Sequence, residues 1–218
     1  MTAPLVKICG LTRAEDTALA EELGAAFTGF VFARKSPRFI EPAAAGAIPK
    51  GRSKRVGVFV NAPEEEILRA VDAARLDFIQ LHGGESVETC RRLGPERLIK
   101  VLWPQAESPG SLQQAIDTFA GACAWFLLDA GSAGSGGTGG ALEWAALRSL
   151  RFPKPWLLAG GLGPDTLAPA LAALRPMVPD GVDINSMVEL SPGIKNKSLV
   201  RKTFSVIQAL QGGNNKNA

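Results

Sequence analysis

The chain has 218 residues, of which 46% are apolar and 21% charged, so its composition is that of an ordinary globular protein. A net charge of +3 without a basic run argues against a nucleic-acid partner, and no apolar run reaches the roughly 18 residues that span a bilayer. Three scattered cysteines without a CxxC pair, one histidine and no secretory signal favour a reducing, cytoplasmic setting and argue against a disulfide framework or a metal site.

Short runs of β-forming residues alternate along the chain with segments of helical spacing. The expected strands, in chain order, are residues 6–9, 27–32, 55–60, 78–82, 98–103, 125–129, 156–159 and 182–185. Helix starts are marked in the gaps by Thr12, Asn61, Ser111 and Pro164, and a final helix carries apolar residues through 200–207. The crossover 41–48 is short and alanine-rich, which predicts a weak helix. Eight strand–helix units indicate a parallel sheet built from βαβ units.

The alternation within the strands favours a closed barrel over a doubly wound sheet. In VKIC, IQLH and VDIN one parity is aliphatic and the other carries Lys7, Cys9, Gln80, His82 and Asp183. A doubly wound sheet is covered by helices on both faces and needs nearly continuous apolar strands, whereas a barrel directs one parity into its interior. The sequence therefore predicts a single (β/α)8 TIM-barrel domain over residues 1–218, with a polar, frayed tail at 211–218.

The stretch 131–140 contains six glycines and includes GSGGTG, a literal match to the dinucleotide fingerprint. The glycines do not close the preceding strand tightly, the acidic residue expected about 20 residues later is missing, and the unit is the sixth rather than the first. A flexible linker fits the composition, but it would divide one series of βα units. The favoured interpretation is a βα-loop at the carboxyl face of the barrel, next to Asp129.

Motifs along nearly the whole chain resemble one family. The stretches VKICGLTRAED, GFVFARKSPRFI, VGVFVN, IQLHGGE, LLDA, GGTG, LEW, LLAGGL, VDINSMVE and PGIKN look like phosphoribosylanthranilate isomerase of tryptophan biosynthesis, in that family's order. The resemblance implies an Amadori rearrangement of a small phosphorylated substrate, with no cofactor and no metal. It leaves open whether the chain is a monomer or a homodimer.

The resemblance implies Asp129 as the acid that opens the ribose ring and Cys9 as the base that removes the proton from the second ribose carbon. Taken alone, a strand-end cysteine is more often a small buried apolar residue, and a strand-end aspartate often caps a turn. Lys7 shares a strand face with Cys9, so we expect its cation to favour the thiolate. Enclosure by the glycine-rich loop is expected to raise the pKa of Asp129. His82 is expected only to hydrogen-bond in the mouth.

The substrate would carry an anion at each end. Arg38 is the candidate for the anthranilate carboxylate, because its planar guanidinium matches a carboxylate in geometry. The turns after the seventh and eighth strands, with Gly160, Gly161, Asn185 and Ser186, are candidates for the phosphate. Asp183 resembles the residue near the sugar hydroxyls.

One position departs from the family, which typically reads Asp-x-Ser-Ser-Gly-x-Glu where this chain has DINSMVE. Met187 in place of glycine means either that the turn avoids a positive φ or that the chain binds phosphate less tightly. A non-catalytic, phosphate-sensing barrel therefore stays open as an alternative. A second enzyme alternative is a related phosphate-binding barrel such as indole-glycerol-phosphate synthase. This chain offers no suitably placed Lys-and-Glu acid/base pair that matches that enzyme.

Overall fold

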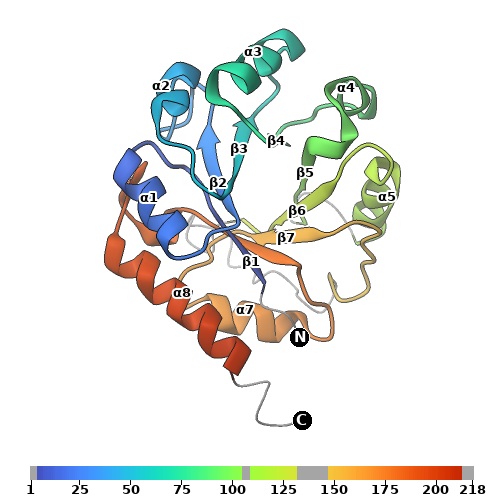
Figure 1. Cartoon of the computed structure of the whole chain (residues 1–218). Helices are drawn as coiled ribbons and strands as arrows, with labels where there is room; N and C mark the ends of the chain where they lie inside the picture. Colours follow the sequence, from blue (N-terminus) through green and yellow to red (C-terminus); the bar gives the residue numbers. More distant parts are fainter. Residues whose placement is uncertain (1–3, 105–108, 132–146, 213–218) are drawn as a thin grey trace.

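The computed structural model describes residues 4–104, 109–131 and 147–212. Its eight parallel strands form a closed barrel in sequential order, so that β1 pairs with both β2 and β8 (Figure 1). The strands are β1 (Leu5–Ile8), β2 (Phe27–Val31), β3 (Lys54–Phe59), β4 (Phe78–Leu81), β5 (Leu98–Leu102), β6 (Trp125–Asp129), β7 (Trp156–Ala159) and β8 (Gly181–Ile184). The predicted TIM barrel is confirmed.

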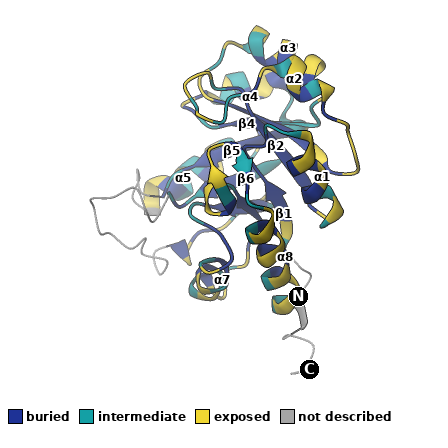
Figure 2. Cartoon of the chain, turned by 90° about the vertical axis from the view of Figure 1, so that its left-hand side faces the viewer, coloured by how far each residue is buried: buried dark blue, intermediate teal, exposed yellow. Residues whose placement is uncertain are grey.

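Helices surround this barrel, with buried faces turned to the strands and exposed faces outward (Figure 2). They are α1 (Ala14–Glu22), α2 (Pro42–Ala47), α3 (Glu64–Ala74), α4 (Val87–Leu93), α5 (Pro109–Phe119), α7 (Leu167–Leu174) and α8 (Lys197–Gly212), with 3-10 turns η1 (Pro95–Arg97) and η2 (Ser186–Val188). A two-stranded antiparallel sheet, β9 (Glu189–Ser191) and β10 (Ile194–Lys195), follows η2. Within the described residues no helix is both long and apolar enough to cross a membrane.

The barrel interior is apolar at its amino-terminal end and polar at its carboxyl end. Phe27, Phe78 and Trp125 begin β2, β4 and β6, and their rings meet edge to face, with the centroid of Phe27 5.8 Å from that of Phe78 and 5.6 Å from that of Trp125. Edge-to-face contacts are a preferred packing of aromatic rings. This aromatic layer fills the interior at the amino-terminal ends of the strands, so an internal site is restricted to their carboxyl ends.

Two predicted boundaries differ from the described elements. Helix α5 already includes Pro109, two residues before Ser111, and proline is well suited to an early helical position, where its missing N–H costs no hydrogen bond. The tail predicted to begin at residue 211 overlaps α8, which includes residues up to Gly212. Residues 213–218, and 132–140 of the glycine-rich stretch, lie outside the described residues.

Candidate active site

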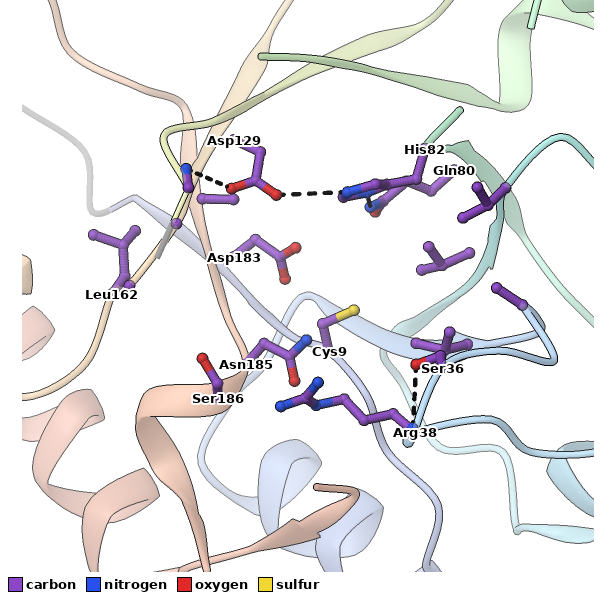
Figure 3. Close-up of a pocket in the computed structure, with 18 residues that line it drawn as sticks. Cys9, Ser36, Arg38, Gln80, His82, Asp129, Leu162, Asp183, Asn185 and Ser186 are labelled. Atoms are coloured by element: carbon purple, nitrogen blue, oxygen red, sulfur yellow. Dashed lines mark hydrogen bonds and ion pairs between the residues drawn. The ribbon is translucent and has the colours of Figure 1, made fainter. Parts of the chain in front are cut away.

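All eight residues predicted to act on the substrate line one cavity at the carboxyl ends of the strands. Its volume is about 360 Å³, within the range of small-molecule sites. In Figure 3, Asp129 and His82 lie on one side and Arg38 and Asn185 on the other, with Cys9 between them. The predicted residues that it brings together are Cys9, Arg38, Asp129, Gly160, Gly161, Asp183, Asn185 and Ser186.

Cys9 follows β1 directly and is only 4% exposed. A side chain at Gly29 on the neighbouring strand would place its Cβ 2.9 Å from the Cys9 Sγ, so glycine leaves the room that the thiol occupies. Burial raises the pKa of Cys9 above its usual value, and the Lys7 cation opposes this without reversing it. The predicted effect of Lys7 therefore has the right direction but is smaller than the effect of burial.

Lys7 is fully buried, and its ammonium interacts with both Asp183 and Cys9. Its Nζ lies 3.0 and 2.9 Å from the two carboxylate oxygens of Asp183 on β8. Burial lowers the pKa of Lys7, but the charges of Asp183 and Cys9 raise it by more, so the net shift is upward. Lys7 is thus a cation held between the candidate base and a cavity carboxylate.

Asp129 is the last residue of β6 and its side chain is 22% exposed. Its Oδ1 accepts a hydrogen bond from the Gly131 N–H at 3.0 Å, while its Oδ2 lies 3.6 Å from His82 Nε2. The carboxyl is thus oriented from two directions. Most of the loop that was expected to enclose it lies outside the described residues.

Arg38 reaches the cavity from the loop after β2 and is held by a buried carboxylate. Its Nε lies 3.0 Å from both oxygens of Glu189, and its Nη2 lies 2.6 Å from one of them. Lys195 Nζ lies 2.8 Å from Glu189 Oε1 and 3.0 Å from Asn185 Oδ1. Since Lys195 is bound to the amide oxygen, Asn185 turns its NH2 into the cavity, towards Cys9 in Figure 3.

The turn after β7 depends on glycine. Gly160 has a φ of +100°, and a Cβ there would lie 2.7 Å from the backbone N and O of Gly131. Gly161 also has a positive φ, of +60°. Met187, by contrast, is in η2 and is not among the described residues with positive φ. The turn after β8 therefore avoids the conformation that made methionine a concern.

The cavity wall between Cys9 and the Arg38 loop is apolar. Val31, Ala33, Val58 and Val60 line it, and the first three pack with Cys9 as one cluster. The side of the cavity next to the Arg38 loop therefore offers an apolar surface.

Comparisons with known proteins agree with this geometry. The model of the N-(5'-phosphoribosyl)anthranilate (PRA) isomerase family matches residues 6–206. The N-(5'-phosphoribosyl)anthranilate isomerase of Maridesulfovibrio salexigens is 43% identical over 204 residues, which cover 93% of this chain and 98% of that relative. The chain belongs to this isomerase family. It is accordingly an isomerase of tryptophan biosynthesis, as the motifs implied.

Solved isomerases have the same barrel. The phosphoribosyl anthranilate isomerase of Thermus thermophilus superimposes with a TM-score of 0.79 at 38% identity, covering 94% of this chain and 99% of that one. Another, solved in complex with reduced 1-(o-carboxyphenylamino)-1-deoxyribulose 5-phosphate, has a TM-score of 0.78 at 31% identity with the same coverage. A ligand of this class thus binds a barrel that superimposes on the present one.

Three polar residues that shape the site were not among the predicted site residues. Gln80 lines the cavity beside His82, while Glu189 and Lys195 lie outside its lining and hold Arg38 and Asn185. The polar parity of IQLH points Gln80 into the barrel, so a signal for it existed in the sequence. No sequence spacing links Arg38 to Glu189, since their contact depends on where the β9–β10 segment folds.

Proposed function

We propose that this chain converts N-(5'-phosphoribosyl)anthranilate into 1-(o-carboxyphenylamino)-1-deoxyribulose 5-phosphate, with Asp129 as general acid and Cys9 as general base. The observation that carries the proposal is the shared cavity: a thiol after β1 and a carboxyl at the end of β6 line one space of about 360 Å³. An Amadori rearrangement needs both groups within reach of one sugar.

Asp129 acts first. It gives its proton to the ribose ring oxygen, the C–O bond to the first ribose carbon breaks, and a protonated Schiff base forms with the anthranilate nitrogen. The Gly131 N–H and the His82 ring then face the carboxylate that remains. Charge develops on Asp129 as the ring opens, so these preoriented groups stabilise it where it forms.

Cys9 acts second, as a thiolate. It takes the proton from the second ribose carbon, and the electrons neutralise the iminium nitrogen to give an enolamine, which becomes the ketone. The proposed role requires deprotonation of a thiol whose pKa burial has raised, and Lys7 is the cation that favours it.

The two ends of the substrate are recognised differently. Arg38 binds the anthranilate carboxylate, because Glu189 fixes its guanidinium beside the wall formed by Val31 and Val58. The phosphate lies over Gly160 and Gly161 on one side and Asn185 and Ser186 on the other. Glycine lets a phosphate oxygen approach the backbone closely. Asp183, bound to Lys7, faces the sugar hydroxyls between the two ends.

The experiment is turnover of freshly generated phosphoribosylanthranilate by the unmodified chain and by Cys9→Ser and Asp129→Asn. Each variant is expected to lose about 100- to 10,000-fold in kcat with KM changed little, because a general acid or base contributes that much. Cys123→Ser is the matched control, since its Sγ donates to the Phe119 carbonyl at 3.4 Å and a hydroxyl can do the same. Robust turnover by both site variants refutes the roles, and no turnover by the unmodified chain favours a sensing barrel.

The proposed base also bears on the compartment. A thiol that must become a thiolate is open to oxidation, and an oxidised sulfur removes no proton. All three cysteines are free and buried. We infer that the protein works in the reducing cytoplasm.

A further inference from the structure

Gln80 is a buried amide whose two polar atoms are in different situations. It lies on β4, lines the cavity and is 1% exposed. Its Nε2 lies 3.3 Å from Nδ1 of His82, two residues along the strand. Its Oε1 is buried and has no hydrogen-bond partner among the described residues. The amide therefore contacts His82 through its NH2 group and not through its oxygen.

The contact between Gln80 and His82 determines where the imidazole carries its proton. An amide NH2 only donates, so Nδ1 of His82 must accept and carries no proton. Burial lowers the pKa of His82, which favours the neutral ring with a single N–H. That N–H is then at Nε2, the atom 3.6 Å from Asp129 Oδ2. Trp103 meets the imidazole edge to face, at 5.4 Å between ring centroids, and limits its rotation.

We propose that Gln80 is a positioning residue, which fixes the Nε2–H tautomer of His82 and so directs an N–H at the carboxyl of Asp129. This inference rests on the proposed role of Asp129 as the acid. Once Asp129 has given up its proton, the Nε2–H stabilises the carboxylate across the cavity. The opposite tautomer would present a lone pair to that carboxylate and repel it, and a wrongly protonated histidine is known to cost an active site much of its rate.

The distance of 3.6 Å is longer than a hydrogen bond, as catalytic contacts often are in the absence of substrate. The charged groups that act on the ring are Asp129 on β6, Lys7 on β1, Asp183 on β8 and Glu85 in the turn after β4. Within the described part of the chain, the hydrogen-bond donor that faces Nδ1 is the Gln80 amide, so Gln80 is the residue that sets the tautomer.

The test uses the fact that the chain has one histidine. With 15N-labelled histidine, a two-dimensional proton–nitrogen spectrum reports the tautomer of His82 with no overlap from other rings. At about pH 8, where histidine is neutral, the unmodified protein is expected to show Nε2–H. Gln80→Glu, which only accepts near Nδ1, should move the proton to Nδ1 or add a second one. Gln80→Met, of similar size, should leave a mixture of tautomers.

Gln208→Glu on the exposed face of α8 is the control for added charge and should leave the spectrum unchanged. An Nδ1–H ring in the unmodified protein overturns the proposal. This measurement does not depend on the folding of any variant. An unchanged Nε2–H ring in both Gln80 variants also overturns it.

Turnover supplies the second readout. Gln80→Met should lower kcat roughly tenfold with KM nearly unchanged, as expected for loss of a group that orients a catalytic one. A changed tautomer with full turnover would refute the positioning role while leaving the proposed reaction intact. Failure of the unmodified chain to turn over phosphoribosylanthranilate would refute the proposed function instead, whatever the spectrum shows.

Discussion

Cys9 is the residue whose charge state controls the proposed reaction. Its thiol is surrounded by protein, and burial outweighs the nearby Lys7 cation, so its pKa is raised. Near neutral pH the thiol is then the major form and the thiolate the minor one. Each unit of pH below the pKa changes the thiolate fraction tenfold.

The pH profile follows from this sign. Between about pH 7 and about pH 8.5, kcat/KM is expected to rise close to tenfold per unit, because the active thiolate becomes more abundant as pH increases towards a raised pKa. A steady-state profile of the unmodified enzyme checks this. A flat profile across that range would mean that deprotonation of Cys9 does not limit the rate.

Replacing Lys7 tests whether its cation lowers the pKa of Cys9 against the effect of burial. In Lys7→Met the thiolate loses its nearest cation, so the Cys9 titration should move to higher pH, measured as the pH dependence of alkylation at Cys9. The variant should also lose about 3–5 kcal/mol of stability, because Asp183 is left buried without its partner. Lys100→Met is the control: Lys100 is equally buried and paired with Glu85. An unmoved titration in Lys7→Met refutes the role of Lys7.

At the scale of elements, one carboxylate joins loops that are far apart in the chain. Glu189, at the start of β9, accepts from Arg38 in the loop after β2, from Lys195 on β10 and from the Gly193 N–H. Burial raises the pKa of Glu189, but these donors lower it by more, so it is ionised in the folded state. Its contribution to stability is present above the usual glutamate pKa and is lost as pH falls below it.

Glu189→Gln should therefore release Arg38 and destabilise the fold. We expect KM to rise about tenfold and the free energy of unfolding to fall by about 2–4 kcal/mol, since the partners are left buried and unpaired. Glu41→Gln is the matched control, because Glu41 pairs with Arg34 in the same loop but both side chains are more than half exposed. Equal, small effects of the two variants on KM and stability would show that the contact with Glu189 does not position Arg38.

Gly160→Ala tests the contact between the turns after β6 and β7. An added Cβ would meet backbone atoms of Gly131 and Ala130 at 2.7–2.8 Å and would need a φ of +100°. We expect a loss of about 2–3 kcal/mol in stability and a weaker affinity for phosphate-bearing ligands. At Gly121 a Cβ meets nothing within 4 Å, so Gly121→Ala should behave like the unmodified chain. Calorimetry measures the stability of both variants, and ligand titration measures their affinity for phosphate-bearing ligands.

The sequence predicts which side chains enter the cavity better than it predicts how they are held. Period-two alternation places Cys9 and Gln80 inside the barrel, and position at a strand end places Asp129 at its mouth. The contact of Glu189 with Arg38 joins residues 151 positions apart, and no local pattern encodes it. The pairing of Lys7 with Asp183 also needed the register between β1 and β8, which only barrel closure sets.

At the scale of the whole molecule, the two ends of the barrel differ. The aromatic layer of Phe27, Phe78 and Trp125 fills the interior at the amino-terminal ends of the strands, and the cavity lies at their carboxyl ends. The fold was predictable because eight regular strand–helix units with one polar parity are compatible with few architectures. The extent of α5 was less predictable, because a helix boundary depends on interactions within a single turn.

The central claim is that one sugar lies between Cys9 and Asp129. The most direct measurement is a crystal structure of this protein with reduced 1-(o-carboxyphenylamino)-1-deoxyribulose 5-phosphate. The account predicts the Cys9 sulfur within about 3.5 Å of the second sugar carbon and the Asp129 carboxyl within hydrogen-bond reach of the oxygen that closes the ribose ring in the substrate. A ligand bound with either residue out of reach of these atoms would contradict it.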